Sequence, residues 1–242
     1  EILIGLVGSE MCIRDSRVGA AVKNNEGEWV LLNGNQTALM FVYYLITRWK
    51  ELGKINGKEY IVKTIVTTET IKTIAERNGV EMYDVYTGFK WIANVMRENE
   101  GKKNYIGGGE ESYGFLCEDF VRDKDAVSAC VILAEIAAWA KDQGLSLYQL
   151  LQKIYVEYGF SKEKGISVVK KGKSGAEEIE AMMKKFRENP LTEIAGSKVT
   201  YFYDYSTLKG KDYAENETVT LDMPTTCLLY TSPSPRDRSV SR

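Results

Sequence analysis

The chain has 242 residues and a net charge of −2, which is enough length for one large domain or one and a half ordinary ones. The near-neutral charge gives no reason to expect nucleic acid or an anionic membrane surface as a partner. With four cysteines and no histidine, no disulfide framework or metal cluster is implied. Residues 1–8 are too short an apolar stretch for a membrane span, so we expect a cytoplasmic protein.

The first and last sixteen residues share no pattern with the chain between them. Residues 6–15 can be reverse-translated into a transposase-type sequencing-library adapter, and residues 227–237 into its reverse complement. The complementarity continues to both chain ends. We therefore expect 1–16 and 227–242 to be adapter-derived and not native, and we exclude both from reasoning about the fold.

The remaining residues predict alternating elements. Residues 17–34 indicate a β-hairpin around the polar stretch 24–27. Residues 35–52 carry apolar side chains at helical spacing, and Gly53 follows as a stop signal. The next expected elements, in order, are a strand at 60–68, a helix capped by Thr68 and ended by Asn78 and Gly79, a strand at 81–88, a helix at 89–99 and a strand at 102–108. This alternation predicts an α/β domain with a largely parallel sheet and ligand loops at the strand ends.

Two more helices are predicted next, and the order of predicted elements then changes to strand, helix, strand. Residues 123–144 are apolar on most sides and predict a buried helix. A capping box of Ser146 and Gln149 opens another helix, which Gly159 closes. Beyond it we expect a strand at 166–172, a helix with a capping box of Ser174 and Glu177, and a half-buried strand at 198–206. This order indicates the beginning of a smaller α+β domain.

Residues 105–115, YIGGGEESYGF, place two carboxylates and a hydroxyl between glycines. Glycines allow the backbone conformations that would bring Glu110, Glu111 and Ser112 close to a ligand. A solvated turn is the simpler alternative. A glycosidase acid and base pair is disfavoured, because such carboxylates must flank a glycosidic bond from opposite sides and these two are neighbours on one loop.

Five segments in register resemble one family: LLNGNQTALMF, VTTETI, VYTGFKWIANVM, GGGEESYGF and VRDKDAV. Together they resemble the α-D-phosphohexomutases, in their phosphoglucomutase-like branch. The resemblance implies an intramolecular phosphotransferase that interconverts hexose 1-phosphate and 6-phosphate through a bisphosphorylated sugar, with an active-site phosphoserine and Mg²⁺. It also implies four domains, of which residues 17–33 would end the second.

On this resemblance, residues 34–160 form domain 3, the sugar-binding domain, with three layers around a mixed, largely parallel sheet. Residues 161–226 would begin a truncated fourth domain. The phosphoserine loop and the phosphate-clamping Arg-Pro-Ser-Gly-Thr loop are absent from the sequence. Of the metal loop, Asp-x-Asp-x-Asp-Arg, only Arg17 matches, because Asp15 falls in the expected adapter. The resemblance therefore implies an inactive fragment that retains no Mg²⁺ ligands.

The resemblance assigns contacts to sugar hydroxyls to Glu110 and Ser112, with Glu111 supporting the loop or pointing away. A carboxylate suits that task because it accepts charge-assisted bonds from two adjacent hydroxyls. The form GEESYG favours glucose over mannose as the sugar. A hexose phosphate is the expected partner.

Four further positions are expected to face the substrate or its phosphate. Thr87, Gly88 and Lys90 lie at a strand-to-helix turn, where free amides and a lysine would attract phosphate. An ordinary capped helix with a surface lysine is the alternative. Lys124 matches a family lysine that faces the substrate, and it equally fits a salt-bridged helix start. For the chain as it stands, a non-catalytic sugar-phosphate-binding module is the alternative to a mutase.

Overall fold

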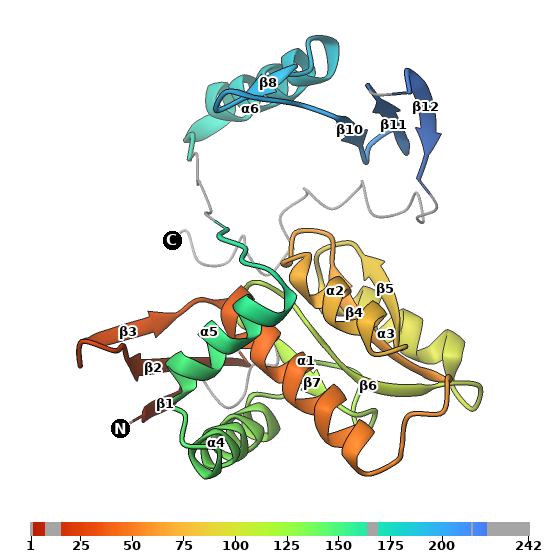
Figure 1. The fold of residues 1–242 in the computed structure, drawn as a ribbon. Coiled ribbons are helices and arrows are strands. Elements are labelled where there is room, and N and C mark those ends of the chain that lie inside the picture. Colours follow the sequence, from red (N-terminus) through yellow and green to blue (C-terminus); the bar gives the residue numbers. More distant parts are fainter. Residues whose placement is uncertain (1, 8–15, 164–168, 214, 222–242) are drawn as a thin grey trace. The chain divides into compact units, whose positions relative to one another are not determined.

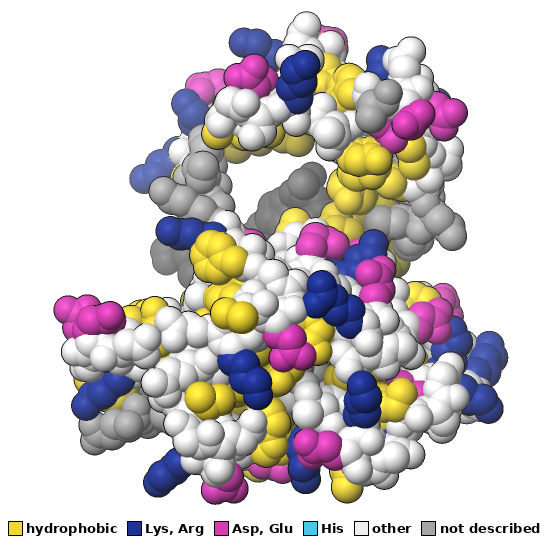
Figure 2. Space-filling view, in the orientation of Figure 1, with side chains coloured by type: hydrophobic (Ala, Val, Ile, Leu, Met, Phe, Trp, Pro, Cys, Tyr) yellow, Lys and Arg dark blue, Asp and Glu magenta, His cyan; other side chains and the backbone are white. Residues whose placement is uncertain are grey.

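The computed structural model describes residues 2–7, 16–163, 169–213 and 215–221. The chain divides into two compact units, unit 1 at Glu1–Lys164 and unit 2 at Gly165–Arg242. Figure 2 shows acidic and basic side chains interspersed over the face in view, which agrees with the near-neutral charge. None of the helices in the described ranges is long and apolar enough to cross a bilayer.

The central sheet of unit 1 has the strand order β5-β4-β6-β7 (Figure 1). Strands β4 (Glu59–Thr64), β5 (Glu81–Val85) and β6 (Asn104–Gly109) are parallel, and β7 (Phe115–Cys117) is antiparallel to β6. Every residue of β4 is buried, as expected for a parallel strand covered on both faces. The predicted α/β fold with a mixed, largely parallel sheet is confirmed.

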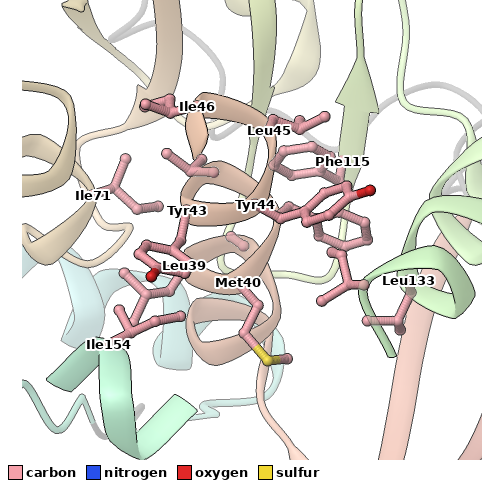
Figure 3. Packing of buried hydrophobic residues seen from close by; sticks show 14 of the residues in the cluster. Leu39, Met40, Tyr43, Tyr44, Leu45, Ile46, Ile71, Phe115, Leu133 and Ile154 are labelled. Atoms are coloured by element: carbon pink, nitrogen blue, oxygen red, sulfur yellow. The ribbon is translucent and has the colours of Figure 1, made fainter. Parts of the chain in front are cut away.

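Helices cover both faces of this sheet. Ile61 of β4 packs into a cluster with α1 (Gly34–Glu51), α2 (Thr70–Arg77), α4 (Ala126–Asp142) and α5 (Leu147–Tyr158). Its neighbours Tyr60 and Val62 pack on the other face with α3 (Phe89–Asn99). Figure 3 shows α1 at the centre of the first cluster, surrounded by Ile71, Phe115, Leu133 and Ile154. Neighbouring side chains of one strand thus supply two cores, which makes the domain three-layered.

The start of α1 fixes its position. Asn33 caps the helix by accepting a bond from the Gln36 amide at 2.9 Å, and the Gln36 side chain accepts one from the Asn33 amide at 3.0 Å. This reciprocal capping box satisfies two amides that a helix otherwise leaves without partners. The predicted helix and its stop at Gly53, which has φ +65°, are confirmed.

A second sheet of unit 1 contains the predicted hairpin, β2 (Arg17–Lys23) and β3 (Trp29–Leu32), which pair antiparallel. Strand β1 (Ile2–Val7) pairs antiparallel with the other edge of β2. Residues 2–7 thus occupy a strand although the sequence reasoning excluded them. An open strand edge pairs with any extended backbone, so this pairing does not depend on the origin of the segment. That origin stays a prediction, and residues 8–15 and 222–242 lie outside the described residues.

Some boundaries differ from expectation. Strand β4 ends at Thr64 rather than at residue 68, because the Thr67 amide bonds back to the Thr64 carbonyl at 2.9 Å and starts a turn. Helix α4 was expected to be buried, but Val127 and Val131 are 64% and 62% exposed. An apolar composition therefore did not require burial on all sides. The Ser146 and Gln149 capping box of α5 and its end at Gly159 are confirmed.

The described residues of unit 2 form one helix and short antiparallel strands. Its elements are α6 (Gly172–Glu188), β8 (Glu193–Ile194), β9 (Ser197–Lys198), β10 (Tyr201–Asp204), β11 (Lys209–Asp212) and β12 (Glu217–Thr220). Helix α6 begins two residues before Ser174, so the predicted Ser174–Glu177 capping box is wrong. The strand expected at 166–172 falls partly outside the described residues, and 169–171 have no regular structure.

Candidate functional site

Three loops follow the carboxyl ends of the parallel strands β5, β4 and β6 and therefore lie at one edge of the sheet. The first is the TGFK turn, residues 87–90, which opens α3. The second is the threonine turn, residues 64–69, after β4. The third is the glycine loop, residues 110–114, between β6 and β7. The predicted site residues Glu110, Ser112, Thr87, Gly88 and Lys90 belong to the first and third of these loops.

The TGFK turn requires a glycine at its second position. Gly88 has φ +118° and stands at the N-cap of α3, a conformation that other residues rarely adopt. Glu110 reaches this position from the glycine loop, and its carboxylate Oε1 accepts a bond from the Gly88 amide at 2.8 Å. The amide at the start of the helix is therefore bonded to a carboxylate of the neighbouring loop.

Burial raises the pKa of the Glu110 carboxyl above its usual range, because the side chain is removed from water. The Gly88 amide and the charges of Lys124 and Arg17 oppose this shift, while Glu111 adds to it. Glu110 is 4% exposed. A buried carboxylate with nearby cations and a spare oxygen is suited to accept hydrogen bonds from ligand hydroxyls.

Lys124 lies beside Glu110. A Cβ atom added at Gly114 would lie 2.9 Å from the Lys124 Cδ and 3.1 Å from the Glu110 Oε2, so both side chains cover the same glycine. The ammonium of Lys124 is 3.1 Å from Asp123 Oδ1 and 5.6 Å from the centroid of the Phe89 ring. Lys124 thus pairs with an acid just before α4 and also lies against the glycine loop. Its contact with the substrate stays a prediction.

Arg17 contacts the glycine loop through the backbone. Its Nε donates to the Ser112 carbonyl at 2.7 Å, and the next amide, of Val18, donates to the Tyr113 carbonyl at 3.1 Å. The beginning of β2 is therefore hydrogen-bonded to the loop tip, although the two segments are 95 residues apart. The structure brings Arg17, Gly88, Glu110, Ser112 and Lys124 together.

Thr87 and Lys90 are exposed at the rim of the same turn. The Lys90 ammonium lies 5.0 Å from the centroid of the Trp91 ring, a cation–π contact. Their predicted contact with phosphate stays a prediction.

Sequence reasoning missed the threonine turn. The Glu111 carboxylate accepts bonds from the hydroxyls of Thr64 at 3.0 Å and Thr67 at 3.3 Å, and both threonines are buried. The Glu111 amide donates to the Thr67 hydroxyl at 3.2 Å. Glu110 and Glu111 therefore point to different partners, which argues against an acid and base pair across one bond.

A buried lysine was also missed. Lys63 is the second-to-last residue of β4, and its side chain is 1% exposed. Its ammonium is 2.6 Å from Asp84 and 2.7 Å from Glu69. It also donates to the Thr67 carbonyl at 3.3 Å. A lysine directly after the apolar residues Tyr60, Ile61 and Val62 of a predicted strand was the signal in the sequence, because a lysine is rarely buried without partners.

No group of three or more potential metal ligands occurs among the residues that the structure describes. Asp15, the remaining acid near the expected metal loop, lies outside them. The magnesium cofactor that the resemblance implies stays a prediction.

A comparison with family models matches residues 33–158, 126 of the 242 residues, to "Phosphoglucomutase/phosphomannomutase, alpha/beta/alpha domain III". The phosphoglucomutase of Staphylococcus haemolyticus is 33% identical over 202 residues, which are 84% of this chain and 36% of that protein. That of Staphylococcus aureus strain USA300 is 38% identical over 191 residues, 79% of this chain and 34% of that protein.

The open form of parafusin, a phosphoglucomutase from Paramecium, has a similar fold. Its TM-score is 0.50 at 16% identity, over 84% of this chain and 33% of that one. The chain thus spans a little over a third of the length of the phosphoglucomutases that it matches. The motifs, the three-layer domain and these matches agree: the chain belongs to the phosphoglucomutase/phosphomannomutase family.

Proposed function

We propose that this chain is the sugar-binding part of a phosphohexomutase that interconverts hexose 1-phosphate and hexose 6-phosphate. The buried Glu110 carboxylate carries the proposal, because it joins the glycine loop to the TGFK turn and has Lys124 beside it. Residues 34–160 are domain 3 in this proposal, 17–33 end domain 2 and 161–226 begin domain 4. The relatives are named as phosphoglucomutases, which supports the reaction class.

In this reaction the sugar must be held in two orientations, because the phosphoryl group is donated at one end and taken back from the other. Glu110 and Ser112 would bind hydroxyls that are common to both orientations. The carboxylate accepts the hydroxyl hydrogens, and the cation of Lys124 offsets phosphate charge. Catalysis of this kind depends mainly on positioning and charge stabilisation, which is what these residues supply.

The phosphoserine and Mg²⁺ would supply the phosphoryl transfer itself in the full-length protein. The 242-residue sequence contains neither an Asp-x-Asp-x-Asp segment nor the histidine of a Ser-His-Asn phosphoserine loop. We therefore propose that this chain has no mutase activity. We also propose that residues 1–16 and 227–242 are adapter-derived and that the protein acts in the cytoplasm.

Glucose phosphates are the preferred substrates in this proposal and mannose phosphates the second candidate, on the form GEESYG of the loop. A non-catalytic module that binds sugar phosphate is the alternative function. The exposed TGFK turn and the Glu110 carboxylate support it equally, because both concern binding and not phosphoryl transfer.

Two measurements test the proposal. The gene that surrounds residues 17–226 should encode a Ser-His-Asn phosphoserine loop upstream and an Asp-x-Asp-x-Asp segment directly before Arg17. The full-length protein should then convert glucose 1-phosphate in an assay coupled to glucose 6-phosphate oxidation, and the 242-residue chain should not. Flanking sequence without either motif would favour the binding module, and turnover by the short chain would contradict its inactivity.

A further inference from the structure

The segment NGNQ, residues 33–36, and residues 66–69 of the threonine turn carry part of the family resemblance, yet neither supplies a predicted substrate contact. Both contact the glycine loop. We propose that they form a platform that positions this loop, with Gly34 and Thr67 as its positioning residues. This inference rests on the proposed function for its link to sugar binding.

Gly34 provides the close approach. It is the first residue of α1, and a Cβ atom at this position would lie 1.8 Å from the Glu111 carbonyl oxygen and 2.8 Å from the Tyr113 nitrogen. Cβ atoms do not approach backbone atoms so closely, so any other residue would displace the loop. The loop backbone therefore lies directly on the start of the helix.

The other three residues of the NGNQ segment also form hydrogen bonds that fix the start of α1 or the threonine turn. Asn33 and Gln36 form the capping box that fixes the first turn of α1. The side chain of Asn35, which is 9% exposed, accepts a bond from the Thr68 amide at 2.9 Å. One helix start thus holds the glycine loop through Gly34 and the threonine turn through Asn35.

Thr67 provides the hydrogen bonds. Its hydroxyl is 2.7 Å from the Thr64 hydroxyl, 3.3 Å from the Glu111 carboxylate and 3.2 Å from the Glu111 amide. Thr67 is 2% exposed, so water does not readily replace these bonds. Both the backbone and the side chain of Glu111 are therefore bonded to one hydroxyl.

Glu111 lies between the two predicted sugar contacts, Glu110 and Ser112. Glu110 is bonded to Gly88 and the Ser112 carbonyl to Arg17, so the residue between them decides whether the two keep their spacing. The platform fixes Glu111 in two ways: Gly34 packs against its carbonyl group, and the Thr67 hydroxyl bonds its amide and its carboxylate. Such support for binding side chains is what precise positioning requires.

The first experiment uses the 242-residue chain without any sugar. Thr67→Val keeps the shape of the side chain and removes its hydroxyl, and Thr67→Ser keeps the hydroxyl. Amide hydrogen exchange in peptides covering residues 110–114 should be about tenfold faster in Thr67→Val and unchanged in Thr67→Ser. Thr73→Val on α2 is the matched control, since the Thr73 hydroxyl has no hydrogen bond to another residue in the described ranges.

The second experiment measures kinetics in the full-length protein. Thr67→Val should raise KM for glucose 1-phosphate about tenfold and change kcat less than about threefold, because loosening the loop weakens binding of substrate and transition state alike. Loss of folded protein alone would instead lower the apparent kcat and leave KM unchanged. Gly34→Ala should raise KM at least as much, and Gly19→Ala, where a Cβ has open space, should not.

The two experiments separate the two proposals. Unchanged loop exchange and unchanged KM in both Thr67→Val and Gly34→Ala would overturn the positioning platform even if the enzyme is active. A full-length protein that neither turns over nor binds glucose 1-phosphate would refute the proposed function. In that case the exchange experiment alone still decides whether Thr67 positions the loop.

Discussion

The Glu110 carboxylate accepts a hydrogen bond from the Gly88 amide at 2.8 Å, and this bond joins two loops that sequence reasoning treated as separate contacts. Both loops follow parallel strands of the same sheet edge. The acceptor expected for sugar hydroxyls and the turn expected for phosphate are therefore held as one structural unit. Changes at Glu110 should affect both.

The first prediction compares the two neighbouring carboxylates in the full-length protein. Glu110→Ala should lower kcat/KM about 100-fold or more, because it removes the proposed hydroxyl acceptor and leaves the partly buried Gly88 amide without the carboxylate that it bonds. Glu111→Ala should lower it about tenfold, because the loop loses the bonds to Thr64 and Thr67 only. Steady-state kinetics with glucose 1-phosphate measure both.

A matched control is Glu118→Ala, at an exposed position beyond β7, which should leave kcat/KM unchanged. Equal losses for Glu110→Ala and Glu111→Ala would contradict the different roles assigned to the two residues.

The second prediction concerns the ionisation of Glu110 in the 242-residue chain. Burial raises its pKa, and the charges of Lys124 and Arg17 counteract the rise. Lys124→Met keeps much of the side-chain bulk and removes one of these charges, so the pKa of Glu110 should rise further. Titration of the carboxyl carbon by NMR measures it.

This shift has a consequence for stability. A carboxyl with a raised pKa binds protons more tightly in the folded chain, so its ionisation lowers the free energy of unfolding as pH rises through its unfolded pKa towards its folded pKa. The loss should be larger in Lys124→Met. Lys141→Met, on the last turn of α4, is the control. A fall in the pKa of Glu110 in Lys124→Met would contradict the assigned electrostatics.

Much of the fold followed from the sequence because helix stops and apolar spacing are local signals. Gly53, Gly79 and Gly159 adopt the positive φ expected where helices end. The end of β4 was not predicted, because residues 60–68 are rich in β-branched side chains up to Thr68 and contain no glycine or proline that would mark a turn. Hydroxyl bonds between Thr64 and Thr67 turn the chain there, and their partner Glu111 lies 47 and 44 residues away.

The sequence named the residues of the candidate site, whose contact with sugar stays a prediction, but it did not reveal the contacts that support the glycine loop. The glycines on either side of Glu110 and Ser112 indicated a ligand loop, and five segments in the expected order indicated the family. The contact between Gly34 and the Glu111 carbonyl depends on how α1 packs against the loop, which no local pattern encodes. The bond from Arg17 to the Ser112 carbonyl could not be predicted either, because it joins residues 95 positions apart and no sequence motif indicates it.

The third prediction concerns the buried Lys63. Its partners Glu69 and Asp84 have side chains that are 69% and 35% exposed, so water can solvate them when the lysine charge is removed. Lys63→Met should therefore change the free energy of unfolding by less than about 1.5 kcal/mol, while Lys63→Ala should cost about 2–4 kcal/mol through the cavity it leaves. Urea denaturation of the 242-residue chain measures both changes in the free energy of unfolding. Equal losses for Lys63→Met and Lys63→Ala would show that the charge of Lys63 contributes more to stability than the volume of its side chain.

The fourth prediction concerns acid stability through Glu59, which is 1% exposed. Burial alone would raise the pKa of this carboxyl, but bonds from the Asn56 and Gly57 amides, at 2.8 and 2.9 Å, and from the Asn104 side chain outweigh it. The Lys58 amide also donates to the carboxylate, at 3.1 Å. The pKa of Glu59 is consequently held below its ordinary value of 4.5. A lowered pKa means that the ionised form stabilises the fold.

This stabilisation is fully present above pH 4.5 and is lost as pH falls through the folded pKa of Glu59. Glu59→Gln should lower the free energy of unfolding by about 1–3 kcal/mol near neutral pH, because it weakens the charge-assisted bonds from three backbone amides to a buried carboxylate. The difference from the unaltered chain should shrink on acidification, since the carboxyl is then neutral in both states. Glu76→Gln, at an exposed position on α2, is the control. Urea denaturation at a series of pH values measures the difference, and a constant gap through the acid range would show that the charge of Glu59 is not what stabilises its turn.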